Sequence, residues 1–397
     1  MLNRMKLVFA SGLSQILGAF HALLFTYLAT NSLSPSEFGD VRYIMSILPI
    51  LMLFSLPSYD GVILRSIVKK IRLSLFNVTI ARVLGGILGS IVLVVYLCAN
   101  NDLSPELIFL MSCLVLLLPF FETTTGFRNY LIGLRLKSQA VKLLTINKIL
   151  SIFFLMIAYW SLMLLEVNFL WIFPFYILSL IVPNLISWSS FCHNLSTKSS
   201  INTNSIYLKS AIVTTFASGL GTLAFSLDKI LIKNNLGSEK LAYYSILVMV
   251  PLELAKLVDS LIPIFYRRIM SSPKQIAKSK VIAIVFFCFS SLFLLACFLF
   301  FVYPLFFGDF YTYSFFDVLC ACFFIISGGV EFYFVHKTYY LGYNRALLLY
   351  SFVSVIITFA MLGFLFDFES ILLIVVCLFT RQLIQPLIFL SYFKRWS

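Results

Sequence analysis

Several ionisable side chains lie inside long apolar runs, where they could bind a charged ligand or a coupling ion. The stretch FSLDKILIKNNLG, residues 225–237, holds Asp228 and Lys229 side by side, and LFTRQLIQP holds Arg381 near the middle of its run. An ionisable side chain at the centre of a bilayer costs about 2.5–3.5 kcal/mol on insertion scales, so it usually faces a wet cavity or a partner. Arg381 is too deep to snorkel easily, which leaves a functional cavity or a structural pair between helices.

The first two of these residues are not expected to pair with each other. Neighbouring residues point about 100° apart around a helix and do not face each other. Asp228 therefore needs a partner from another helix or water, whereas Lys229 and Lys233 share a different face.

Other charges extend the same pattern. The stretch PLELAKLVDSLIP places Glu253, Lys256 and Asp259 three residues apart, which brings the lysine beside both acids on a helix. These three either neutralise one another locally or serve function. The remaining candidates are two acids well inside their runs and two bases nearer the predicted inner surface, for which snorkelling is favoured: Glu331 and Glu122, and Lys148 and Arg82.

The composition shows what kind of elements must position these charges. Of 397 residues 61% are hydrophobic and only 11% are charged, and the mean hydropathy is +1.01. Apolar runs of roughly 20 residues, long enough to cross a bilayer, recur from end to end. We interpret the chain as an all-α, multi-pass membrane protein with twelve helices, at about 7–30, 41–64, 76–98, 106–127, 143–165, 169–190, 209–232, 242–266, 281–304, 316–337, 346–366 and 370–393.

The charges between these runs predict the orientation. Cytoplasmic loops are rich in Lys and Arg, and alternate segments of this chain carry either bases or mostly acids. The pattern places both termini in the cytoplasm. The net charge of +13 then reflects topology, and no nucleic-acid partner is expected.

An internal repeat predicts two similar halves. FASGL occurs at 9–13 and again at 216–220, and Pro49 and Pro251, then Arg65 and Arg267, follow at nearly the same offset. We expect six-helix halves at 1–200 and 201–397 that enter from the same side of the membrane. Parallel repeats of this kind bind substrate between the halves and rock about it.

Absent motifs narrow the function further. The sequence has no G-x-x-x-x-G-K-[ST] phosphate loop, no H-E-x-x-H and no G-x-S-x-G, and its three histidines are far apart. Enzymatic catalysis, a resident metal and a bound cofactor are therefore not expected.

Three segments resemble one family of transporters. LSPSEFGDVRYI, SLPSYDGVILRSI and SLDKILIKNNLGSEKLAYYSI are similar to segments of Wzx-type O-antigen or polysaccharide flippases, within the multidrug/oligosaccharidyl-lipid/polysaccharide (MOP) exporter superfamily. GFRNYLIGLRL is similar to the family's Y-L-x-G-x segment. The resemblance implies a MATE-like fold of two six-helix bundles around a cationic cavity. It carries over Asp60, Arg65 and Asp228 as motif residues.

The implied activity is movement of an undecaprenyl-diphosphate-linked oligosaccharide between the leaflets of the bacterial inner membrane by alternating access. Arg381, Lys256 and Arg65 are expected to contact the diphosphate, with Arg82 and Lys148 as further candidates. Coupling to protons or sodium through Asp228, Glu253 or Asp259 stays open. The implied partners are the lipid-linked glycan, membrane lipid and polymerase or chain-length machinery.

Two alternatives remain. A multidrug exporter of the same superfamily would use acids to bind cationic drugs, and the central Arg381 argues against it. A membrane glycosyltransferase or O-antigen polymerase would commonly need a large outer loop, which this chain lacks.

Overall fold

The structure is a computed structural model of the whole chain. It describes residues 2–393 except 58, 60–62, 64–74, 101–102, 122, 135, 196–203, 271–277, 342–343 and 366–369. Within these residues every regular element is a helix. The described part of the chain contains nine helices that are long and apolar enough to cross a membrane. The all-helical, multi-pass prediction is confirmed, and the count of twelve spans stays a prediction.

The chain divides into two compact units. Unit 1 comprises Met1–Leu33 with Tyr43–Ser226, and unit 2 comprises Ser34–Arg42 with Leu227–Ser397. Two helices, α2 (Pro35–Leu51) and α9 (Asn204–Leu236), contribute residues to both units. The predicted boundary at residue 200 describes a sequence repeat and stays a prediction.

Unit 1 is built around the pairing of α1 (Leu2–Thr30) with α7 (Lys137–Leu165) and of α7 with α8 (Ile172–Leu195). The helix α4 (Leu75–Ala99) packs against α5 (Pro105–Leu117) and against the 3-10 turn η1 (Met52–Ser55). A Cβ added at Gly85 of α4 would stand 2.0 Å from the carbonyl oxygen of Phe54. The absence of a side chain at Gly85 is therefore what lets η1 approach α4 so closely.

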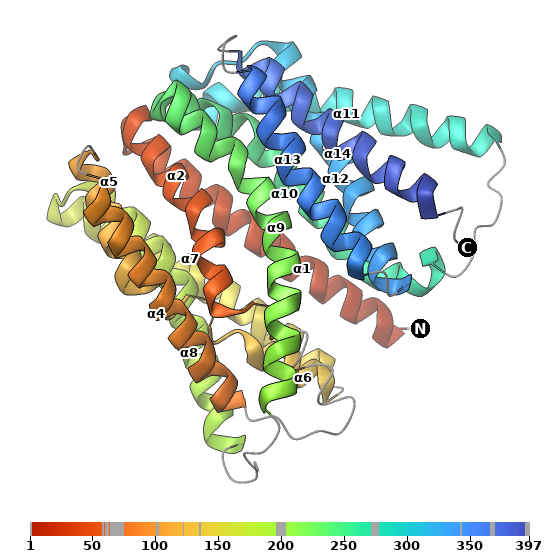
Figure 1. Ribbon diagram of the computed structural model, residues 1–397. Coiled ribbons are helices and arrows are strands. Elements are labelled where there is room, and N and C mark those ends of the chain that lie inside the picture. Colours follow the sequence, from red (N-terminus) through yellow and green to blue (C-terminus); the bar gives the residue numbers. More distant parts are fainter. Residues whose placement is uncertain are drawn as a thin grey trace. The chain divides into compact units, whose positions relative to one another are not determined.

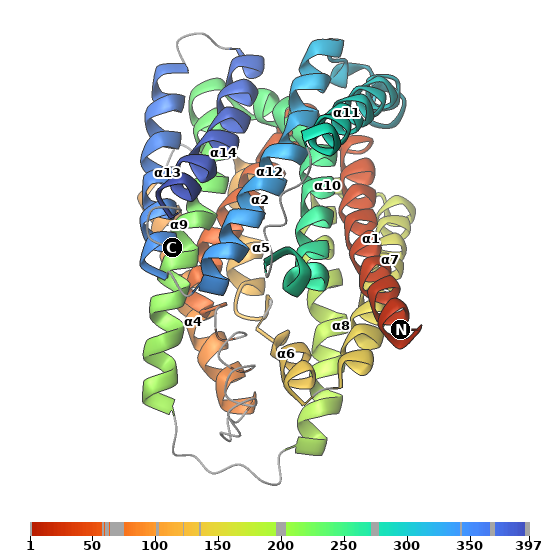
Figure 2. The same cartoon turned by 90° about the vertical axis from the view of Figure 1, so that its right-hand side faces the viewer.

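Unit 2 is centred on α12 (Phe315–Leu341), which packs against α10 (Ser238–Met270), α11 (Lys278–Phe307) and α14 (Ile371–Phe393). The helix α13 (Asn344–Leu365) packs against α14 and α12, and all three appear side by side in blue in both views (Figures 1 and 2). Large apolar side chains such as Phe287, Phe301 and Leu305 of α11 are exposed, as expected for a surface that faces lipid.

Two predicted helices differ from the observed ones. The helix predicted at 41–64 begins at Pro35 and ends at Leu51, and the backbone then passes through η1 to Leu56, where φ is 52°. The helix predicted at 106–127 ends at Leu117, and a turn containing Pro119 leads to the short helix α6 (Gly126–Gly133). Proline explains the second break, because it cannot donate a backbone hydrogen bond to a continuing helix.

Candidate functional site

A polar pocket of about 240 Å³ lies inside unit 1. Among the lining residues that the structure describes, the two charged ones are both basic, Arg128 on α6 and Lys148 on α7, and none is a carboxylate. The other lining residues offer hydroxyls, amides and apolar surface: Ser14, Gln15, Phe121, Thr125, Phe127, Leu144, Asn147, Ser151, Leu180 and Asn184. The pocket therefore has the chemistry to accept an anion.

The break after α5 positions one of the two bases. Because the chain turns after Leu117 and restarts as α6, Arg128 lies in the first turn of a separate short helix. The apolar side chains of α6 anchor that helix, since Phe127 and Leu131 belong to a buried cluster with Val78 of α4. The backbone of Arg128 is therefore fixed, because the helix α6 that carries it is packed into this cluster.

A glycine on α1 makes room for the other base. A Cβ at Gly18 would stand 3.6 Å from Cε of Lys148, in ordinary contact, so a longer side chain there would meet the lysine. One turn further along α1, the ring of His21 bonds to Ser179 at 2.9 Å and stacks on Tyr176. This packing fixes α1 beside the lysine.

Amide side chains complete the wall of the pocket. Nδ2 of Asn147 donates to Oδ1 of Asn184 at 3.0 Å, and the hydroxyl of Ser187 donates to Oδ1 of Asn147 at 2.8 Å. Nδ2 of Asn184 donates to the carbonyl oxygen of Leu180 at 2.9 Å. The first two bonds connect α7 to α8, and together the three bonds fix the orientation of both amide side chains.

Snorkelling was the favoured expectation for Arg82 and Lys148, and this expectation is wrong for Arg82. Its side chain is 1% exposed, so it is buried inside unit 1. Lys148 is half-buried and lines the pocket. The two residues lie on different helices, α4 and α7, and only Lys148 is among the lining residues.

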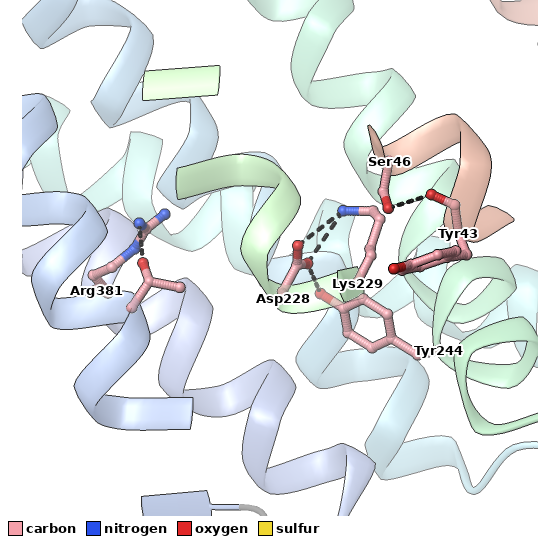
Figure 3. A network of polar contacts seen from close by, with 7 residues as sticks. Tyr43, Ser46, Asp228, Lys229, Tyr244 and Arg381 are labelled. Atoms are coloured by element: carbon pink, nitrogen blue, oxygen red, sulfur yellow. Dashed lines mark hydrogen bonds and ion pairs between the residues drawn. The ribbon is translucent and has the colours of Figure 1, made fainter. Parts of the chain in front are cut away.

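Unit 2 contains a second polar cluster, shown in Figure 3. Nζ of Lys229 lies 3.1 Å from Oδ1 and 3.2 Å from Oδ2 of Asp228, so the expectation that these neighbours do not pair is wrong. The long lysine side chain reaches round the helix surface. The expected partner from another helix is Tyr244 of α10, whose hydroxyl donates to Oδ2 of Asp228 at 2.5 Å.

Arg381 belongs to the polar interior of unit 2. It is 5% exposed, and its Nη1 donates to Oγ1 of Thr358 on α13 at 2.6 Å (Figure 3). The same Nη1 lies 3.5 Å from the carbonyl oxygen of Ser354, also on α13. The guanidinium is therefore held against α13 at two residues.

Glu331 and the helix after it are linked by further hydrogen bonds. The hydroxyl of Tyr350 donates to Oε1 of Glu331 at 2.7 Å, and Nε2 of Gln385 donates to the carbonyl oxygen of Tyr350 at 3.0 Å. The hydroxyl of Ser354 donates to Oε1 of Gln385 at 2.9 Å. The network connects α12, α13 and α14.

The other predicted site residues are not part of the described hydrogen-bond network of unit 2. Nζ of Lys256 lies 2.6 Å from Oε1 of Glu253, and the lysine side chain is 65% exposed. This ion pair is the local neutralisation that one of the two alternatives expects. Asp60, Arg65 and Glu122 lie outside the described residues, as does the side chain of Asp259.

Sequence reasoning did not identify Arg128 or Tyr244 as site residues. Arg128 lies in GFRNYLIGLRL, one residue beyond the helix predicted at 106–127, and nothing in the sequence indicated that a separate short helix would place it in a pocket. Tyr244 is a neutral residue among many tyrosines, and only its packing against α9 shows its role.

Comparison with known proteins identifies the fold. No family model matches the chain, and no curated protein matches it significantly. Among solved structures, a multidrug resistance MATE family transporter of the MOP superfamily matches in its outward-facing conformation with a TM-score of 0.63 and 10% identity, over 98% of this chain and 94% of that one. An inward-facing conformation matches with a TM-score of 0.62 and 12% identity, over 96% and 94%.

A third structure differs in its pocket. It is a MOP superfamily transporter from Pyrococcus furiosus, described as having a binding pocket of reverse polarity that suggests a different function. It matches with a TM-score of 0.62 and 10% identity, over 98% of this chain and 94% of that one. The chain is therefore a multi-pass membrane protein with the fold of the MATE transporters of the MOP superfamily.

Proposed function

We propose that the protein is a flippase that moves an undecaprenyl-diphosphate-linked oligosaccharide from the cytoplasmic to the outer leaflet of the bacterial inner membrane by alternating access. The observation that carries this proposal is the pocket in unit 1, where Arg128 and Lys148 lie among amide and hydroxyl side chains. The membrane fold supplies the transport framework. The pocket supplies the preference for an anion.

The chemistry of the substrate fits this lining. A diphosphate is bound best by charge-assisted hydrogen bonds, which are roughly twice as strong as neutral ones. Arg128 can bind phosphate oxygens through two parallel N–H groups, and Lys148 adds a point charge. The amides of Asn147 and Asn184 can donate to sugar oxygens beside them.

The membrane potential supplies a driving force that needs no nucleotide. A potential of about 100 mV, inside negative, is worth roughly 2.3 kcal/mol per charge and therefore favours outward movement of a dianion by about 4–5 kcal/mol. Coupling to an ion through Asp228 or Glu331 would add to this force.

A second candidate function rests on unit 2. Asp228 and Glu331 are buried carboxylates, and Oε2 of Glu331 accepts no hydrogen bond from the described part of the chain. Acids of this kind would suit a multidrug exporter that binds cationic compounds. Arg381 acts against that use, because a buried positive charge in the same unit opposes the binding of a cation.

Complementation of a strain that lacks its polysaccharide flippase tests the proposal, with the glycan genes of the source organism supplied. Lys148→Ala and Arg128→Ala should abolish surface glycan at normal membrane abundance, and Lys148→Arg should keep part of it. Lys142→Ala is the matched control, since Lys142 is an exposed base on the same helix outside the pocket. Normal surface glycan with both alanine variants would rule out this pocket as the substrate site, and drug resistance conferred by the wild type in place of glycan would favour the exporter.

A further inference from the structure

A second pocket, of about 510 Å³, lies in unit 2 and is distinct from the charged network around Arg381. This volume is within the range of roughly 300–1,000 Å³ typical of small-ligand sites. Its walls come from the start of α10, the segment between α11 and α12, the first turn of α12 and the start of α14. The lining residues are Glu239, Lys240, Tyr243, Phe310, Thr312, Asp317, Ser370, Ile371 and Leu372. The orientation predicted from the loop charges places these segments on the outer side of the membrane.

One wall of this pocket is a rigidly supported aromatic ring. The hydroxyl of Tyr243 donates to the carbonyl oxygen of Thr312 at 3.1 Å, and the hydroxyl of Tyr313 donates to the carbonyl oxygen of Tyr243 at 2.8 Å. The two rings pack with centroids 4.3 Å apart, and Tyr303 packs edge-on against Tyr313 at 5.3 Å. Tyr243 is thereby fixed at its hydroxyl, at its backbone carbonyl and along one side of its ring.

A second aromatic ring in the lining is exposed. Phe310 lies in the 3-10 turn η3 (Asp309–Tyr311) and is 46% exposed. Tyr311, the next residue, is buried against Phe38 and Phe310, which fixes the turn. Exposed aromatic rings on fixed backbone are suited to stacking on flat apolar faces of a ligand.

The pocket also presents a preset hydrogen-bond acceptor. Oδ2 of Asp317 accepts from the backbone N–H and the hydroxyl of Ser314 at 3.1 and 2.8 Å, which caps the start of α12. Within the described part of the chain, both of these hydrogen bonds go to Oδ2, and none goes to Oδ1 of Asp317. The carboxylate is therefore fixed in direction while one oxygen remains available to a ligand. Glu239, Lys240, Thr312 and Ser370 add further donors and acceptors.

We propose that this outer pocket binds one or two sugar residues of a glycan; the proposal rests on the flippase function above and names a subsite for its cargo. Sugars combine a C–H face that stacks on aromatic rings with hydroxyls that donate to carboxylates and accept from ammonium groups. An organic cation would also find carboxylates and rings here, but it would leave Lys240 without an acceptor on the ligand. A polyhydroxylated, uncharged ligand can use all of the lining groups, since its hydroxyls both donate to the carboxylates and accept from the lysine.

Saturation-transfer NMR on the purified full-length protein in detergent tests this subsite. The probes are methyl glycosides of common hexoses and N-acetylhexosamines, together with the oligosaccharides released by mild acid from the lipid extract of the source organism. Phe310→Ala and Asp317→Asn should reduce the transfer to sugar ring protons several-fold. Asn at position 317 can still accept from Ser314, so the helix cap is kept. Phe316→Ala, which removes a ring that is also exposed but lies outside the pocket, should change nothing.

The outcomes separate this inference from the proposed function. Transfer that both pocket variants reduce supports the subsite whether or not the chain complements a flippase mutant. Absence of transfer to every probe, or transfer that Phe310→Ala and Asp317→Asn leave unchanged, overturns the subsite even if Lys148→Ala abolishes surface glycan. Binding of ethidium that is lost in the same two variants, without sugar binding, would also overturn it and would assign the pocket to organic cations.

Discussion

Lys233 of α9 and Asp40 of α2 form an ion pair in unit 2, although 193 residues separate them along the chain. The hydroxyl of Ser238 contacts Lys233 and donates to Oδ1 of Asp40 at 2.7 Å. A Cβ at Gly39 would stand 1.9 Å from the carbonyl oxygen of Ser238, so glycine is needed there. Two of the segments that suggested the family resemblance, LSPSEFGD and LIKNNLGSEK, therefore bind each other.

Asp40→Ala should lower the free energy of unfolding by about 3–5 kcal/mol, because Lys233 would keep a largely buried charge without its carboxylate. Adding Lys233→Met should recover part of that loss. Thermal unfolding in detergent, followed by tryptophan fluorescence, measures both effects. Asp309→Ala, at an exposed acid, is the control. Identical melting of Asp40→Ala and the wild type would show that the ion pair contributes nothing.

Arg381 and Glu331 should be energetically coupled, since a chain of hydrogen bonds through α13 and α14 connects the two buried side chains. Arg381→Ala and Glu331→Gln should each destabilise the protein, and the double variant should lose about 0.5–3 kcal/mol less than the sum of the two. A denaturant or thermal double-mutant cycle gives this coupling energy. Arg381→Ala combined with Asp309→Asn should be additive, and strict additivity of the first pair would contradict the link through these bonds.

Gly18→Leu should displace the Lys148 side chain without unfolding unit 1, because the added side chain would occupy the space in which the end of that lysine lies. We expect surface glycan in the complementation assay to fall at least tenfold at normal membrane abundance. Gly12→Leu is the matched control on the same helix, since a Cβ there meets nothing within 4 Å. Equal glycan levels in the two variants would mean that the space beside Lys148 is not used.

Gly85→Ala should destabilise unit 1, because its Cβ would overlap the carbonyl oxygen of Phe54 and backbone atoms would have to shift. Overpacking of this kind typically costs about 1–3 kcal/mol. A drop in the melting temperature and in membrane abundance is the expected result. Gly363→Ala, where a Cβ meets nothing within 4 Å, should melt like the wild type; a similar melting temperature for Gly85→Ala would contradict the close packing of η1 on α4.

The helical membrane architecture could be predicted because the lengths of the apolar segments and the positions of the charged residues can be read from the sequence. Arg381 and Glu331 were identified from their depth in apolar runs, and both prove to be buried in unit 2. The repeat and loop charges also predicted an orientation that awaits measurement.

The geometry of the pockets could not be predicted, since it depends on breaks and tertiary contacts. The turn at Pro119 separates α6 from α5 and places Arg128, but a proline within an apolar run does not reveal where the chain goes next. The pairing of Asp228 with Lys229 was wrongly excluded, because helix geometry fixes Cβ directions and leaves a long lysine side chain free to curl back.

Reconstituted transport tests the central claim most directly. The purified protein in proteoliposomes should expose lipid-linked oligosaccharide to an enzyme added to the compartment that corresponds to the periplasm, and a potential positive on that side should accelerate exposure. Lys148→Ala should abolish the protein-dependent rate and Lys142→Ala should preserve it. A rate that is the same for wild type and Lys148→Ala, or one that the potential does not change, would contradict an anionic substrate held by the basic pocket of unit 1.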